Sequence, residues 1–73
     1  MNYDYSNNAF IEIKKSENED VKVLMKKSEI VHISDMVLAN GSMRTKFRLS
    51  NSGEFYFDGS IDEVLERSKT RFI

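Results

Sequence analysis

Hydrophobic and polar side chains alternate most strictly in the segment 43–49. A helix would scatter the cations of this segment around its circumference, whereas an extended chain places them all on one face. A period of two is typical of a strand that is buried on one side only. We therefore expect a strand here. Its inward residues are Met43, Thr45, Phe47 and Leu49, and its outward residues are Arg44, Lys46 and Arg48.

Turn signals flank this strand on both sides. Asn40 and Gly41 precede it, and both residues tolerate a positive φ, which suits a tight turn. A polar cluster at positions 50–53, which ends in Gly53, follows it. The next short run, from Glu54 to Phe57, repeats the alternation. The pattern predicts a β-hairpin in this half of the chain.

The first half of the chain predicts a second hairpin. The run from Ala9 to Lys14 is apolar and β-prone, a polar and acidic turn follows, and Val21 to Met25 alternates with Val21, Val23 and Met25 inward. A third apolar run from Glu29 to Ser34 predicts another strand, which either continues through positions 36–38 or bends away. His32 is expected to share a face with Ile30, opposite Val31 and Ile33, and to be structural.

A helix is expected after Gly59. Ser60 and Glu63 have the spacing of a capping box, in which each side chain binds the free backbone amide of the other residue. The helix then begins at Ile61. The acidic residues lie early in the run and the basic residues late, which matches the helix dipole. These residues are Asp62, Glu63 and Glu66, then Arg67, Lys69 and Arg71. One side of the helix would be an apolar stripe that packs across a sheet face. This stripe consists of Ile61, Val64, Leu65 and, further along, Ser68.

These elements predict an α+β fold: an antiparallel sheet of about five strands in meander order, with one C-terminal helix packed on one face. Residues 9–73 form a single domain in this interpretation. Residues 1–8 form a flexible N-terminal arm, whose tyrosines, Tyr3 and Tyr5, are candidates for contact with a partner. The alternative is an arm that is simply disordered.

Composition limits the candidate functions. The chain has 73 residues, no cysteine, one histidine and a net charge of −1, so the whole molecule offers no excess charge to attract nucleic acid. It shows no signal-like or membrane-spanning apolar run, and we expect a cytoplasmic protein. The sequence shows no nucleophile with a base, no metal-ligand cluster and no glycine-rich phosphate loop. We therefore expect neither an enzyme nor a bound cofactor or metal.

The succession of a first strand, the apolar pair Ile30 and Ile33, the Asn51-Ser52-Gly53 turn and the terminal Ser60-to-Leu65 helix resembles the flagellar FlbD-type small proteins. The resemblance covers about the last five-sixths of the chain and implies a small β-rich cytoplasmic fold. It carries no site residues across. The chain departs from the family in the segment from Asp35 to Ser42 and in its tyrosine-bearing arm. In size and composition the chain also resembles small accessory proteins of bacteriophages.

The leading hypothesis is a non-enzymatic protein-binding module that homo-oligomerises and occupies a surface of another cytoplasmic protein, for example a phage-encoded inhibitor of a host protein. Two alternatives stay open. One is a nucleic-acid-binding regulator that uses the cations of the strand at 43–49, although the interpretation favoured for these cations is a solvated face or one paired with the neighbouring strand. The other is a small-ligand binder with a pocket between subunits. The candidate partner-binding residues are Tyr3, Tyr5, Arg44, Lys46, Arg48 and Tyr56.

Overall fold

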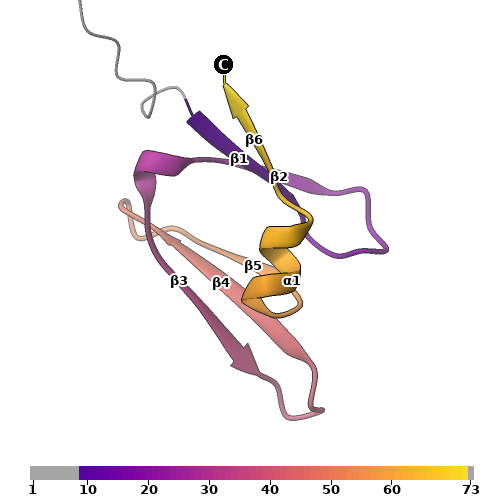
Figure 1. Ribbon diagram of the computed structural model, residues 1–73. Helices are drawn as coiled ribbons and strands as arrows, with labels where there is room; N and C mark the ends of the chain where they lie inside the picture. The colour runs from indigo at the N-terminus through magenta and orange to yellow at the C-terminus, as the bar shows by residue number, and fades with distance from the viewer. Residues whose placement is uncertain (1–8, 73) are drawn as a thin grey trace, which may run out of the picture.

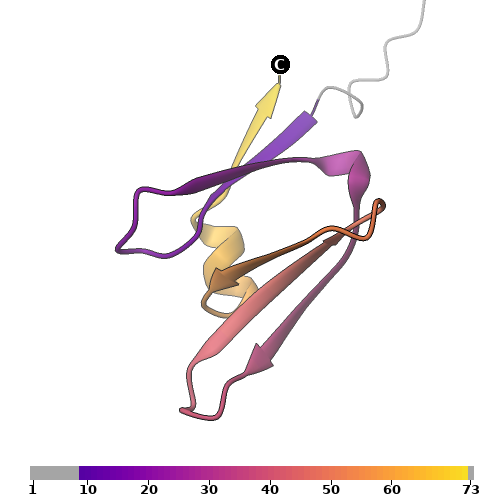
Figure 2. The same cartoon turned by 180° about the vertical axis from the view of Figure 1, so that it is seen from behind.

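Two antiparallel three-stranded sheets and one short helix make up the protein (Figure 1, Figure 2). The computed structural model describes residues 9–72. One sheet has the strand order β2-β1-β6 and the other the order β3-β4-β5. The strands are β1 (Ala9–Lys14), β2 (Lys22–Lys26), β3 (Ile30–Val37), β4 (Met43–Leu49), β5 (Glu54–Asp58) and β6 (Lys69–Phe72), and the helix α1 is Ile61–Glu66.

A single 3-10 turn, η2 (Lys27–Glu29), carries the chain from one sheet to the other. Lys26 before it and Ile30 after it are both extended, so the chain passes from β2 of one sheet into β3 of the other through this turn alone. An arrangement of strands by itself assigns no function.

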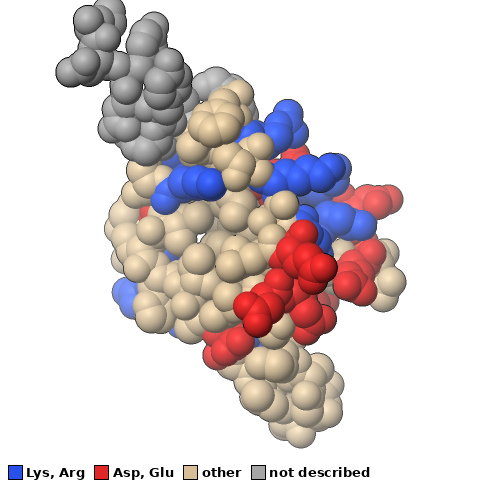
Figure 3. Space-filling view, in the orientation of Figure 1, with Lys and Arg blue, Asp and Glu red and all other residues tan. Residues whose placement is uncertain are grey.

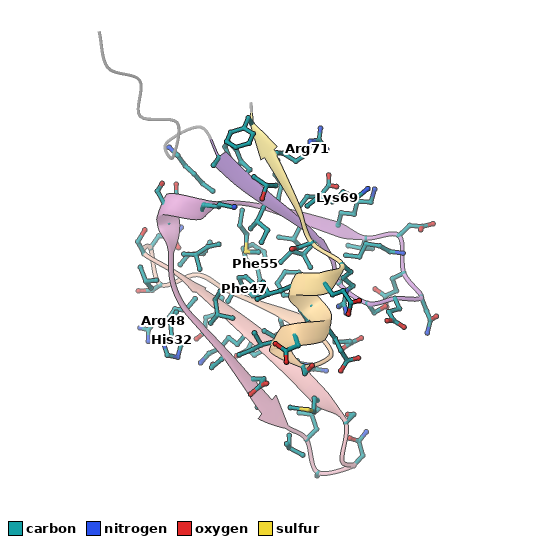
Figure 4. The ribbon with its side chains drawn as sticks, in the orientation of Figure 1. His32, Phe47, Arg48, Phe55, Lys69 and Arg71 are labelled. Atoms are coloured by element: carbon teal, nitrogen blue, oxygen red, sulfur yellow. The ribbon has the colours of Figure 1, made fainter. Side chains whose placement is uncertain are left out.

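The inner faces of the two sheets enclose one hydrophobic core. Phe47 of β4 and Phe57 of β5 meet edge to face with ring centroids 5.1 Å apart, a favourable aromatic geometry. Figure 4 shows Phe47 and Phe55 pointing into the space between the sheets. One polar side chain is fully buried there: the Thr45 hydroxyl donates to the carbonyl of Gly59 at 2.8 Å. The other fully or nearly buried apolar side chains are Ala9, Ile11, Ile13, Met25 and Val64.

Several predictions from the pattern are confirmed. The strand at 43–49 is β4, with Thr45 and Phe47 buried and Arg48 exposed. β1 and β2 form the first hairpin and β4 and β5 the second. Gly41 has a φ of 85° in the turn before β4.

The predicted fold class, α+β with one sheet of about five strands and a covering helix, is wrong. More than half of the described residues are in strands, and these strands are divided between two sheets. The helix lies against both sheets and inserts only Val64 fully into the core. The pattern missed the division because the bend at Lys27–Glu29 contains neither glycine nor proline.

The predicted helix is also too long. The capping box of Ser60 and Glu63 is present, but α1 ends at Glu66, and the Ser68 hydroxyl donates to the Leu65 carbonyl at 2.6 Å. The chain then turns into β6, which pairs with β1 so that Phe72 lies opposite Ala9. Pairing with β1 gives the backbone of this segment sheet hydrogen bonds in place of a further helical turn.

Two predicted faces differ from the structure. The pairing of β3 with β4 shifts register between Ile30 and His32, which indicates a bulge. Ile30 and Ile33 therefore both pack on the core, while Val31 and His32 are exposed. The prediction that Ile30 and His32 share a face is wrong for this reason. Val21 was expected to point inward but precedes β2 and is 54% exposed.

Candidate binding surfaces

The predicted cationic stripe lies on the outer face of the β3-β4-β5 sheet. Arg48 has Glu54 opposite it on β5, Lys46 has Tyr56, and Arg44 has Asp58. The Lys46 ammonium lies 3.5 Å from the Glu54 carboxylate, and Arg44 Nε lies 3.9 Å from Asp58 Oδ1. Two of the three cations, Arg44 and Lys46, thus lie within 4 Å of a carboxylate of β5. The interpretation of the stripe that the sequence favoured, a solvated or cross-strand-paired surface, agrees with this geometry.

The remaining cation of the stripe, Arg48, lies beside His32. The two residues are cross-strand neighbours, and both are exposed (Figure 4). Together with Lys46 and with Ser50 and Ser52 of the next turn, they line an open hollow on the surface. Because this hollow is open to solvent, it does not enclose a small ligand in the way that ligand pockets usually do.

The other sequence-predicted partner residues divide into two groups. Tyr56 is 39% exposed, and its ring centroid lies 6.0 Å from the guanidinium carbon of Arg44, so it belongs to the same outer face as the stripe. Tyr3 and Tyr5 lie outside the described residues.

A second and more strongly charged surface lies on the outer face of the β2-β1-β6 sheet. Ile11 and Ile13 of β1 are buried, so the intervening residues of β1 and their cross-strand neighbours point outward. These outward residues include five cations and only one carboxylate, and we call them the basic face. Its members are Phe10, Glu12, Lys14, Lys22, Leu24, Lys26, Lys69 and Arg71.

The cross-strand registers define how the basic face is arranged. Phe10 lies between Lys26 of β2 and Arg71 of β6, so an aromatic ring has a cation on either side. The one carboxylate, Glu12, accepts a hydrogen bond from Arg71 at 3.0 Å. Figure 4 shows Lys69 and Arg71 pointing away from the core on the same side of β6.

Two further features of the basic face concern its stability. Lys14 and Lys22 lie directly opposite each other, and like charges in this position destabilise a sheet. Leu24 is 46% exposed in the middle of β2. A like-charge pair and an exposed leucine both lower the stability of the fold, and such residues are expected on a surface that binds a partner.

Acidic side chains gather at a different part of the molecule. They surround Arg67 and line open hollows between the β1–β2 loop, the end of β5 and the helix. Figure 3 shows blue side chains at the upper right, over β6 and the strands beside it, and red ones at the right edge over the β1–β2 loop and at the lower right around α1. We call this second region the acidic pole, and its members are Glu17, Glu19, Asp58, Glu63 and Glu66.

Sequence reasoning missed the basic face. The first signal was present: the lysines at 14, 22 and 26 alternate with apolar residues that the structure buries or half-buries. The second signal was hidden because Lys69 and Arg71 were assigned to the helix, where they matched its dipole. The face becomes visible only when β2, β1 and β6 are placed side by side.

Over residues 9–72 there is no group of three metal-ligating side chains close enough to hold an ion. The same part of the chain has no helix that is both long and apolar enough to cross a membrane. Comparison of the chain with protein-family models, curated proteins and solved structures gave no match. The resemblance to FlbD-type and phage accessory proteins therefore stays a prediction.

Proposed function

We propose that this protein is a non-enzymatic binding module that docks on an anionic macromolecular partner through the basic face. The observation that carries the proposal is the charge of this face: five cations and one carboxylate on three adjacent strands, in a chain whose net charge is −1. The cationic stripe of β4, by contrast, is largely matched by the carboxylates of β5.

Charge segregation supports an oriented encounter with the partner. The acidic pole would be repelled by the same partner that the basic face attracts, which steers the molecule and fixes its orientation on contact. The exposed Leu24 and the half-buried Phe10 add apolar area in the centre of the charged surface. A binding surface with an apolar centre and a charged surround is the usual arrangement of protein interfaces.

The hypothesis of a cytoplasmic partner, such as a host protein inhibited by a phage-encoded module, fits this surface when the partner is acidic where it makes contact. Self-association is a second route to the same complementarity. The acidic pole of one copy has the charge that the basic face of another attracts. Contacts of this head-to-tail kind form rings or open chains.

Two matched triple variants test the proposal. Lys22→Gln, Lys26→Gln and Lys69→Gln together remove three positive charges from the basic face. Arg44→Gln, Lys46→Gln and Arg48→Gln remove the same number from the β4 stripe. We expect the first variant to elute from immobilised heparin, a generic polyanion, at markedly lower salt than the wild type, and the second to elute close to it.

Equal losses in the two variants would contradict the proposal, because the effect would then follow total charge and not the basic face. A larger loss in the stripe variant would return the binding site to β4. Circular dichroism of both variants checks that each is folded. Light scattering at low and high protein concentration shows whether the wild-type chain oligomerises and whether the basic-face variant abolishes that association.

A further inference from the structure

We propose, resting on the function proposed above, that the anionic partner of the basic face is single-stranded nucleic acid, with Phe10 as a platform on which a base stacks. Proteins that bind single strands combine cations along the backbone path with aromatic rings that stack on the bases. The basic face brings these two features together. The stripe of β4 has its nearest aromatic ring, Tyr56, on the neighbouring strand, among residues paired with carboxylates.

The position of Phe10 is the centre of the argument. It is outward-facing on β1, the central strand of its sheet, and is half-buried, so part of the residue is open to solvent. Its cross-strand neighbours are Lys26 and Arg71. A base lying on this ring would have a cation on either side of it. Its own phosphate and the next one could each be neutralised.

The spacing of the other cations extends this path. Neighbouring strands lie roughly 4.8 Å apart, and alternate residues along a strand lie roughly 6 to 7 Å apart. Lys22 and Lys14 continue the face toward one end of β1. Lys69 of β6 adds a further cation opposite Glu12 of β1. A flexible single strand can adjust its phosphates to this grid, whereas the phosphate positions of a duplex are fixed.

A duplex fits this surface less well for a second reason. The faces of paired bases are covered by their neighbours, so Phe10 would have nothing to stack on. The major groove of duplex DNA admits a two-stranded ribbon, but the cations here belong to the outward face of three strands that also cover the core. The basic face is therefore suited to unpaired bases.

Fluorescence anisotropy with a labelled oligothymidylate of about 10 nucleotides, within the usual site sizes of single-strand binders, tests this inference. Log affinity should fall with log salt with a slope of about −0.7 for each phosphate contacted. We expect the Lys26→Gln and Lys69→Gln double variant to make this slope shallower by about 1.4.

The variants of Phe10 separate stacking from charge. Phe10→Leu should weaken binding by roughly 5- to 150-fold, the range seen for loss of one stacked base, without changing the salt slope. Phe10→Tyr keeps an aromatic ring and should bind within about 2-fold of the wild type. Thermal unfolding shows whether Phe10→Leu is folded at the assay temperature. If Phe10→Leu is unfolded, Phe10→Tyr still tests the inference, because a large loss of binding in that variant would contradict it.

Each of the following outcomes would overturn the inference. Binding of a duplex of the same length as tightly as the single strand removes the argument for unpaired bases. Unchanged affinity in Phe10→Leu, or a large loss in Phe10→Tyr, removes the stacking platform. Retention on heparin or binding of a poly-glutamate peptide, without binding of the oligonucleotide, leaves the basic face as a polyanion site and makes an acidic protein its partner. Absence of all three interactions overturns the proposed function as well.

Discussion

Arg67 shows how one side chain can connect elements that are far apart in the chain. The sequence placed it in the last turn of a helix, as a cation that complements the helix dipole. In the structure its Nε donates to the carbonyl of Lys14 at 3.0 Å. Its Nη2 donates to the carbonyls of Lys15 at 3.0 Å and Asp58 at 2.6 Å. The guanidinium thus ties the end of β1 in one sheet to the end of β5 in the other.

Replacement of Arg67 by lysine keeps the charge but loses the planar fork that reaches three carbonyls at once. We expect Arg67→Lys to lower the free energy of unfolding by about 1.5 to 3 kcal/mol, the usual worth of hydrogen bonds to a charged group. Urea denaturation measures this loss. The control, Arg44→Lys, changes an exposed pair at 3.9 Å and should cost less than about 1 kcal/mol. Equal losses would mean that the three carbonyl contacts add nothing.

At the scale of elements, local sequence signals predicted individual strands correctly, but the pairing of distant strands was not predicted. The alternation at 43–49 gave the correct strand and the correct faces, because Thr45 and Phe47 are fully buried and Arg48 is exposed. β6 escaped notice because it has only four residues and none of them is buried. Its existence depends on β1, which is about sixty residues away in the chain. No local pattern reports such a partner.

The candidate site was predictable to the same degree. The β4 stripe is contained in one strand, and both of its possible roles could be weighed from its spacing. The basic face draws on three strands, and two of its cations lie in the unforeseen β6. The bulge that exposes both Val31 and His32 could also not be predicted from the sequence. A bulge is an irregularity in the pairing of two strands, and the order of apolar and polar residues in one strand does not reveal it.

The helix α1 depends on its N-terminal cap. It has six residues, too few to be stable alone. The Ser60 hydroxyl accepts from the Glu63 amide, and the Glu63 carboxylate accepts from the Ser60 amide, both at 3.2 Å. We expect Ser60→Ala to cost about 1 kcal/mol of stability in urea denaturation. Ser60→Asp, which can cap the same amide, should stay within a few tenths of a kcal/mol of the wild type. A similar loss in both variants would assign the effect to something other than the cap.

For the whole molecule, the distribution of charge matters more than its sum. A net charge of −1 conceals a sheet face with five cations and a pole of carboxylates around Arg67. The like-charged pair of Lys14 and Lys22 lies at one end of this face, where a carboxylate would have given a favourable cross-strand pair. The proposed function explains why position 22 holds a lysine. A negative charge there would favour stability, whereas a positive charge favours binding of an anionic partner.

Lys22→Glu tests this opposition directly. The new carboxylate would lie opposite Lys14 and should raise the free energy of unfolding by roughly 0.2 to 1 kcal/mol, measured by urea denaturation at low salt. The same change should lower the salt concentration at which the protein elutes from heparin, since it reverses one charge of the basic face. Lys27→Glu, at an exposed position in η2 outside this face, is the matched control and should change both quantities little. A gain in stability without weaker binding would separate Lys22 from the binding surface. A loss of stability would show that the two lysines do not repel each other in the folded protein.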